Sequence, residues 1–360
     1  MKFFDHLKRF NWGLIGPAFI LTLIGLISIY SSSLGKGDFL NFKKQIIFFV
    51  FSLALFFFLS LFDLRFLKNS SSSILALYFF SFLSLAGLFF WGEEIRGTKS
   101  WYKFGLFSFD PSSLASIFLI LILSKYFASH HSEIKTFRPI FHSFLYLLPL
   151  VLLVLFQPNL GSSIPLIFIW LGIIIFSGVQ FRHFLILALI VLILFGLGWQ
   201  FWLQDYQKQR ILTFLNLKTD SQGSAWQINQ AKIAIGSGGF WGKGIGNGPQ
   251  TQYGFLPELQ TDFIFSAIAE EMGFIGISFL LFFWGILLWQ IIKLSLEANN
   301  NFKKFFAIGF SFLLTSQGFI NMGMNLGLLP IIGIPLPFIS YGGSHLLSFY
   351  LGLGILKALK

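Results

Sequence analysis

The stretch LPELQTDFIFSAIAEEMG, Leu256–Gly273, places three carboxylates, Asp262, Glu270 and Glu271, at the start of and inside an apolar segment. An ionisable side chain at bilayer depth is expensive and is by default a candidate functional group. We expect Thr261 to be the N-cap and Asp262 the first helical residue, where the helix dipole favours an anion. The stretch therefore predicts a membrane helix that begins at an acidic group.

Asp262 can be a simple cap or a functional carboxylate, and its surroundings favour the second reading. Ser266, Ala269 and Gly273 follow near the same helix face by the 3.6-residue period. Their small side chains leave room for a ligand or a closely packed neighbour. A carboxylate beside such a face, at the boundary of lipid and water, is suited to act as a general base.

Glu270 and Glu271 lie about 12 Å deeper along the helix axis, at 1.5 Å per residue. Neighbouring helical side chains point about 100° apart, so the two carboxylates do not easily share one partner. We expect this buried acidic pair to be a structural link within the bundle rather than a catalytic pair.

Composition sets the protein class. The chain has 360 residues, is 55% hydrophobic and 11% charged, and has a mean hydropathy of +0.77. Apolar runs of membrane-spanning length recur throughout, which predicts an all-α polytopic membrane protein. The net charge of +11 sits mostly at helix ends, where anionic membrane lipids attract it, and does not indicate nucleic-acid binding. The chain has no cysteine, and its six histidines lack nearby carboxylates, so no metal site is predicted.

About ten transmembrane helices are expected, in a single membrane domain over residues 1–360. We place them at 13–32, 45–63, 73–91, 112–127, 144–156, 161–178, 183–203, 263–291, 304–326 and 338–356. The fifth is short for a span. Lysines and arginines mark alternate loops, which predicts cytoplasmic N- and C-termini. The large extracytoplasmic loop 204–262, before the eighth helix, is expected to carry much of the site and a helix over Ala225–Ile235.

The glycine-rich run Gly236–Gly248 contains Lys243, and Lys232 and Arg210 lie upstream of it. It lacks the ending of a nucleotide-binding loop. Backbone N–H groups with these bases could hold a pyrophosphate; the alternative is a flexible, turn-rich loop.

Trp101 lies between Lys99 and Lys103 in the outer loop 92–111. An aromatic residue there is typical of an interfacial anchor. The functional alternative is a platform for a sugar ring.

Several runs together resemble one family, the SEDS glycosyltransferases that include RodA, FtsW and SpoVE. They are IRGTKSWYKFG (Ile95–Gly105), QPNLGSS (Gln157–Ser163), RILTFLN (Arg210–Asn216), QAKIAIGSGGFWGKG (Gln230–Gly244), FLPELQTDFIFSAIAEEMG (Phe255–Gly273) and LGLLPIIGIPLPFISYGGS (Leu326–Ser344). The short tails and GLLPIIGIPLPF look more like RodA than FtsW.

The resemblance implies a peptidoglycan glycosyltransferase that polymerises lipid II into β-1,4 glycan strands and releases undecaprenyl pyrophosphate. The family's essential aspartate falls on Asp262 and its outer-loop tryptophan on Trp101. The other matching motif positions, taken as substrate-binding, are Arg210, Gln230, Lys232, Glu258, Ser340, Tyr341 and Ser344. The candidates for neutralising the pyrophosphate are Arg210, Lys232 and Lys243, followed by Arg96 and Lys99.

The resemblance also implies a multi-pass protein of the cytoplasmic (inner) membrane, with its active site facing outward and a class B penicillin-binding protein as partner. The resemblance identifies no cofactor with certainty, and a divalent cation (Mg²⁺ or Mn²⁺) stays open. The likeness to RodA implies a role in cell elongation and the maintenance of cell shape. Two alternatives remain. One is a flippase for lipid-linked precursors, and the other is an FtsW-like division polymerase or scaffold for a class B penicillin-binding protein.

Five positions depart from the family pattern. Asn159 stands where Asp is usual, Gln260 where His is usual, and His345 where Ser is common. Ser113 and Ser116 replace Glu and Lys at i, i+3 spacing, so the loss of both leaves no orphan charge.

Overall fold

The protein is described here by a computed structural model. The structure describes residues 12–62, 64, 70–95, 98–105, 107–130, 137–180, 182, 183, 189, 196, 200, 208, 212 and 223–359. The expected helix at 183–203 and the site residues Arg96 and Arg210 lie largely or wholly outside this part of the chain.

Eight of the described helices are long and apolar enough to cross a membrane. They are α2 (Trp12–Lys36), α3 (Leu40–Leu61), α5 (Ser71–Trp91), α6 (Pro111–Ser129), α7 (Arg138–Phe156), α8 (Leu160–Ser177), α13 (Ile264–Leu296) and α14 (Asn301–Leu326). The polytopic helical class is thereby confirmed. The expectation of a short fifth helix was wrong, because α7 begins six residues earlier than expected and has 19 residues.

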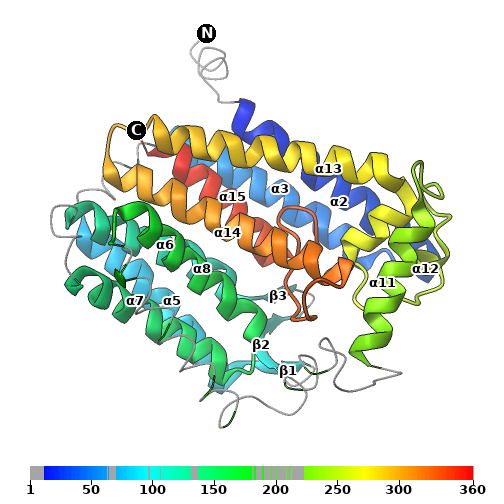
Figure 1. Ribbon diagram of the computed structural model, residues 1–360, viewed down its shortest axis with the longest axis horizontal. Coiled ribbons are helices and arrows are strands. Elements are labelled where there is room, and N and C mark those ends of the chain that lie inside the picture. The colour runs from blue at the N-terminus through cyan, green and yellow to red at the C-terminus, as the bar shows by residue number, and fades with distance from the viewer. Residues whose placement is uncertain are drawn as a thin grey trace.

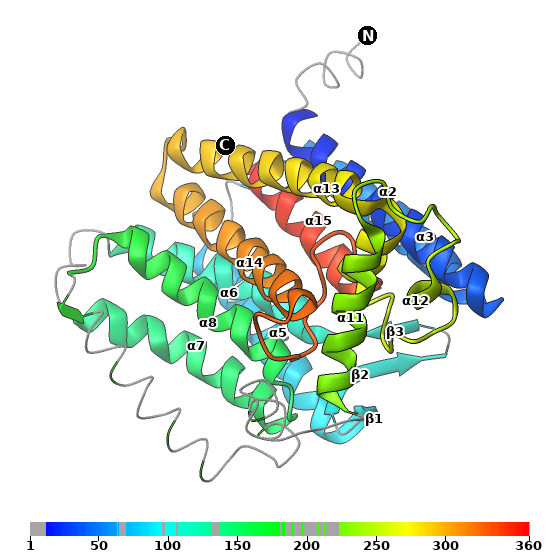
Figure 2. The ribbon, with the colours of Figure 1, turned by 45° about the vertical axis from the view of Figure 1, so that its right-hand side comes forward.

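The helices are arranged around α14, which contacts α6, α8 and α13. The last helix, α15 (Gly343–Ala358), has 16 residues and packs along α3. Figure 1 shows the start of α2 and the end of α15 toward one end of the bundle. The opposite end, here called the loop end, carries the sheet, α11 (Ser224–Gly238), α12 (Pro249–Gln252) and the segment 327–342 (Figures 1 and 2).

A three-stranded antiparallel sheet forms where the sequence analysis expected only an outer loop. Its strands are β1 (Glu93–Ile95), β2 (Thr98–Phe104) and β3 (Phe107–Phe109), in the order β1-β2-β3. Gly105, with φ +59°, turns β2 back onto β3. The Tyr102 hydroxyl donates to the carbonyl of Ser84 on α5 at 2.7 Å, so the sheet is attached to the bundle.

Two expectations about the loop end have different outcomes. The helix expected over Ala225–Ile235 is confirmed as α11. The expected start of α13 was wrong by two residues, because Phe263 occupies its N-cap and no side chain caps the helix. Asp262 therefore belongs to the turn before the helix.

Helix α13 is interrupted at Gly273, where φ is +64° and ψ is −163°. The glycine-rich loop fills the gap. The Lys243 N–H donates to the Glu270 carbonyl at 2.9 Å, and the Phe274 N–H donates to the Gly239 carbonyl at 2.9 Å. Backbone donors of this loop are thus used to complete α13.

The two buried glutamates fasten the same loop by their side chains. The Glu270 carboxylate accepts from the backbone N–H groups of Gln250 and Thr251, at 2.9 and 2.8 Å. The Glu271 carboxylate accepts from the Ser31 hydroxyl at 2.6 Å and from the Gln252 amide at 2.9 Å. The prediction of a structural pair with separate partners agrees with this geometry.

A substitution in the glycine-rich loop tests this docking. Gly242 has φ +82°, and an added Cβ would collide with the Glu271 carbonyl. Gly254 has φ +73° and open space around it. Both Gly→Ala changes carry the left-handed strain, of about 1–2 kcal/mol. We expect Gly242→Ala to lower the unfolding temperature of the detergent-solubilised protein well below that of Gly254→Ala; equal values would contradict the docking.

Candidate active site

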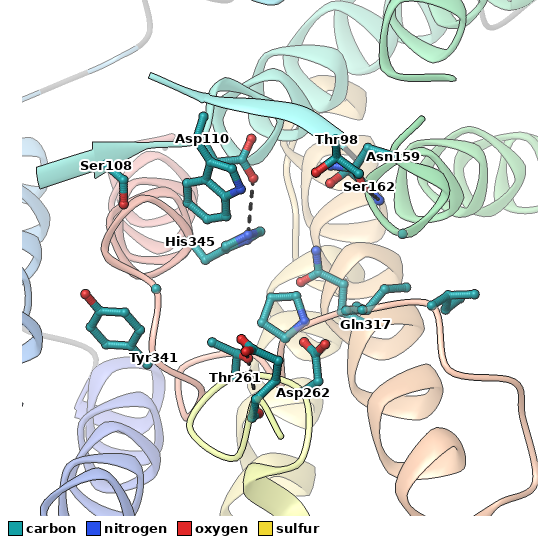
Figure 3. A pocket seen from close by; sticks show the side chains of 18 of the residues that line it. Thr98, Ser108, Asp110, Asn159, Ser162, Thr261, Asp262, Gln317, Tyr341 and His345 are labelled. Atoms are coloured by element: carbon teal, nitrogen blue, oxygen red, sulfur yellow. Dashed lines mark hydrogen bonds and ion pairs between the residues drawn. The ribbon is translucent and has the colours of Figure 1, made fainter. Parts of the chain in front are cut away.

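A cavity of about 720 Å³ opens near the loop end of the bundle. Its walls come from α3, the sheet, the starts of α6 and α8, the turn before α13, helix α14 and the segment 331–345. Figure 3 shows side chains from these distant segments converging on it. The volume is in the range usual for small-molecule sites.

Asp262 is half-buried on the cavity wall. The turn that carries it is set by Glu258, whose φ is +51° and whose carbonyl accepts from the Asp262 N–H at 3.0 Å. The Asp262 carbonyl accepts from the side-chain amides of Asn321 and Asn325 on α14, at 3.0 and 2.9 Å. Glu258 also lines the cavity, as the resemblance implied for a substrate-binding position.

The two residues before Asp262 are held in the same way. The Gln260 carbonyl accepts from the Tyr341 N–H at 2.8 Å. The Thr261 carbonyl accepts from the Ser340 hydroxyl at 2.6 Å. Three successive carbonyls are therefore fixed from other segments, which leaves the Asp262 side chain a defined position.

Three of the positions expected to bind substrate, Ser340, Tyr341 and Ser344, follow α14. Only Tyr341 lines the cavity, and the two serines hold neighbouring backbone groups. Tyr341 lines the cavity, and burial raises the pKa of its phenol, so it is a neutral hydroxyl near pH 7. Ser340 supports the turn and does not line the cavity. Ser344 accepts from the Asp110 N–H at 2.9 Å and is also outside the lining.

A contact between a histidine and an aspartate, which the sequence did not predict, lies on another wall. Nε2 of His345 is 3.3 Å from Oδ2 of Asp110, and both residues line the cavity (Figure 3). Asp110 is the N-cap of α6 and accepts from Ser112. The two partners are 235 positions apart, so the sequence alone could not pair them. The one available signal was that His345 stands where the family commonly has Ser.

Polar contacts continue along the interface of α6 and α15. Ser113 donates to the Asp110 carbonyl at 2.8 Å and accepts from Ser348 at 3.1 Å. Ser116 donates to the Ser112 carbonyl at 3.0 Å. Both serines that replace the family's charged pair are thus satisfied without a charge.

Trp101, on β2, is half-buried and lines the cavity, as expected. Asn159 also lines it and caps α8 by accepting from the Ser162 N–H at 3.0 Å. Its amide donates to Ser100 at 2.9 Å, which ties α8 to β2. Gln260, the departure beside Asp262, donates to Ser32 at 3.0 Å.

The basic residues expected at the site are not brought together. Lys99, Lys232 and Lys243 are exposed and do not line the cavity, and neither does the half-buried Gln230. Among the described residues that line it, Lys44 on α3 is the only lysine or arginine. Nothing in the local sequence distinguished Lys44 from Lys43. Within the described ranges, no group of three or more His, Asp or Glu side chains is placed to hold a metal ion.

Comparison with known proteins identifies the family. A family model described as "Cell cycle protein", for FtsW, RodA and SpoVE, matches residues 12–360. The probable peptidoglycan glycosyltransferase FtsW of Haemophilus influenzae is 34% identical, over 94% of this chain and 86% of its own. Stage V sporulation protein E of Bacillus subtilis is 34% identical, over 94% and 93%. The peptidoglycan glycosyltransferase MrdB of Escherichia coli K12 is 35% identical, over 79% and 76%.

Solved structures have the same fold. A chain from a study of polymerization and crosslinking by a peptidoglycan synthase complex matches with a TM-score of 0.80 and 28% identity, over 97% of each chain. The rod shape-determining protein RodA of Thermus thermophilus matches with a TM-score of 0.70 and 27% identity, over 97% of this chain and 96% of its own. The protein therefore belongs to the SEDS family, a family of multi-pass membrane peptidoglycan glycosyltransferases that includes FtsW, RodA and SpoVE.

Proposed function

We propose that this protein polymerises lipid II into β-1,4 glycan strands, with Asp262 as the general base. The observation that carries the proposal is the placement of Asp262 on the wall of a large cavity, on a backbone fixed by three other segments. The loop end then faces outward, with both termini cytoplasmic and ten helices in the cytoplasmic membrane.

The proposed step is a single displacement. Asp262 takes the proton of the 4-hydroxyl of the acceptor GlcNAc as that oxygen attacks the anomeric carbon of the donor MurNAc. The bond from that carbon to undecaprenyl pyrophosphate breaks, and the leaving group departs with the electron pair. An α-linked donor thus gives a β link. A positioned base typically contributes about 10² to 10⁴ in rate; positioning and electrostatics supply the rest.

Charge on the leaving pyrophosphate needs a cation, and Lys44 is the candidate that the cavity supports. Arg96 and Arg210 remain candidates from the resemblance, while Lys99, Lys232 and Lys243 would act only outside the cavity. Trp101 is suited to contact a sugar ring through its face. Glu258 and Tyr341 offer an acceptor and a hydroxyl to sugar hydroxyls.

The buried pair Glu270 and Glu271, together with broken helices such as α13, would suit the flippase alternative. Both carboxylates accept hydrogen bonds from the loop around α12, which gives them a structural use. The polar groups of the cavity lie toward one end of the bundle, whereas transporter sites usually lie near the midplane. Glycosyl transfer is therefore the better supported function.

Substitution of Asp262 tests the base. We expect Asp262→Asn to reduce polymerisation of purified lipid II by about 10² to 10⁴, without a matching loss of unfolding temperature. Asp38→Asn is the matched control, because Asp38 is an exposed carboxylate that only caps Leu40. Polymerisation by Asp262→Asn at the wild-type rate would remove Asp262 as the base.

The same assay separates the alternatives with the wild-type protein in vesicles. Glycan strands support the polymerase. Transbilayer movement of lipid II without strands favours the flippase. The absence of both activities, with or without a class B penicillin-binding protein, favours a scaffold.

Crowding at the base gives a second prediction. Gly333 has φ +72°, and a Cβ there would lie 3.5 Å from Oδ2 of Asp262. Gly37 has φ +66° with open space around it. We expect Gly333→Ala to lower the polymerisation rate by up to about 100-fold, because the added methyl would lie in van der Waals contact with the carboxylate and occupy space beside it that the substrate needs. Gly37→Ala, with similar backbone strain, should stay near the wild-type rate. Equal rates for the two variants would show that Gly333 does not shape the site.

We also propose a role in cell elongation with a class B penicillin-binding protein, supported by the RodA-like segment 327–338 and by the similarity to a chain of a peptidoglycan synthase complex. Expression in Escherichia coli depleted of MrdB should restore rod shape. Expression in cells depleted of FtsW should leave filaments. Rescue of division alone would assign the protein to division instead.

A further inference from the structure

Three amide side chains lie four residues apart on one face of α14: Gln317, Asn321 and Asn325. The two asparagines hold the Asp262 carbonyl. Gln317 is one helical turn further from the loop end, about 6 Å along the axis. It lines the cavity, and Figure 3 shows its amide directed toward the same space as the Asp262 carboxylate.

Gln317 is 5% exposed, yet its Oε1 has no hydrogen-bond partner among the described residues. A buried polar atom without a partner costs about 1–3 kcal/mol and calls for an explanation. The missing partner is a donor, because an amide oxygen only accepts.

The other buried glutamines of the described part of the chain are paired. Gln45 donates to the Ser340 carbonyl and accepts from the Gly342 N–H. Gln157 donates to the Leu85 carbonyl at 2.9 Å, and Gln260 both donates and accepts. None of these three lines the cavity. Among the described glutamines, Gln317 and the half-buried Gln250 have a buried Oε1 without a partner, and of these two only Gln317 lines the cavity.

The chemistry of the side chain indicates what it would bind. A primary amide offers an acceptor and a donor side by side in one plane, and it carries no charge. A secondary amide matches it with two hydrogen bonds, from its N–H to Oε1 and from Nε2 to its carbonyl. Phosphate lacks an N–H and gains nothing from a neutral acceptor oxygen. The substrate of the proposed reaction carries one acetamido group on each sugar.

We propose that Gln317 binds the acetamido group of one of the two sugars beside Asp262 and makes the site specific for N-acetylated sugars. This inference rests on the proposed function for the identity of the sugar. Gln317 is then a specificity residue, which touches substrate and takes no part in proton transfer.

The test compares lipid II with two analogues, one with a free amine in place of the GlcNAc acetamido group and one with the same change on MurNAc. Binding to the detergent-solubilised protein is measured first, as the ligand-induced rise in unfolding temperature and as Kd. Polymerisation, as KM and kcat, is measured second. Wild type is compared with two variants. Gln317→Met keeps the length of the side chain without its amide, and Gln157→Met is the control for the loss of a buried amide elsewhere.

We expect one deacetylated analogue to bind wild type about 10- to 100-fold more weakly than lipid II, the equivalent of a lost pair of hydrogen bonds. Gln317→Met should bind lipid II and that analogue equally. Gln157→Met should keep the wild-type ratio even where it lowers the unfolding temperature. The analogue that loses affinity identifies the sugar.

Two results would overturn the inference: an unchanged ratio in Gln317→Met, or an equal loss for all three ligands, which is what a purely structural role produces. Failure of the proposed function gives a different pattern. In that case wild type makes no strands, and the binding ratio alone decides whether Gln317 reads the acetamido group.

Discussion

Everything at the cavity depends on how three consecutive backbone carbonyls, of residues 260–262, are held. Tyr341 and Ser340 hold the first two from the segment before α15, and Asn321 and Asn325 hold the third from α14. A carboxylate on a free loop would sample many positions, and each would need ordering at every turnover. Fixing the main chain on both sides lets one side chain present its charge in a constant place, at the expense of many buried polar groups that must all be satisfied.

The sequence predicts most of the fold, because apolar runs of spanning length need no knowledge of distant partners. The helical class, α11 and the structural use of Glu270 and Glu271 followed from local spacing and burial alone. The sheet formed by β1, β2 and β3 was missed because charged and aromatic residues mask its alternation, and its attachment to α5 through Tyr102 is not visible in the sequence. The start of α13 was missed because Glu258 adopts a left-handed backbone conformation that residue type does not announce.

The site was predicted less completely. Asp262, Trp101, Glu258 and Tyr341 lie on one cavity, in agreement with the resemblance. The contact of Asp110 with His345 could not be found, because these two residues meet only through the fold. The glycine-rich loop shows the reverse error. Its glycines suggested an anion cradle, but several of its N–H groups complete the interrupted helix α13.

The interface of α6 and α15 is polar at one end and apolar along the rest of α6. At its loop end it is joined by the Asp110–His345 pair and by serine contacts from Ser344 and Ser348, while the adjoining stretch of α6 is almost wholly apolar and buried. Water can replace hydrogen bonds one at a time, but it cannot replace apolar packing. The polar end of this wall can therefore open by exchanging its hydrogen bonds for water. A bulky polymer could pass through the opened polar end while the apolar part of the interface stays packed.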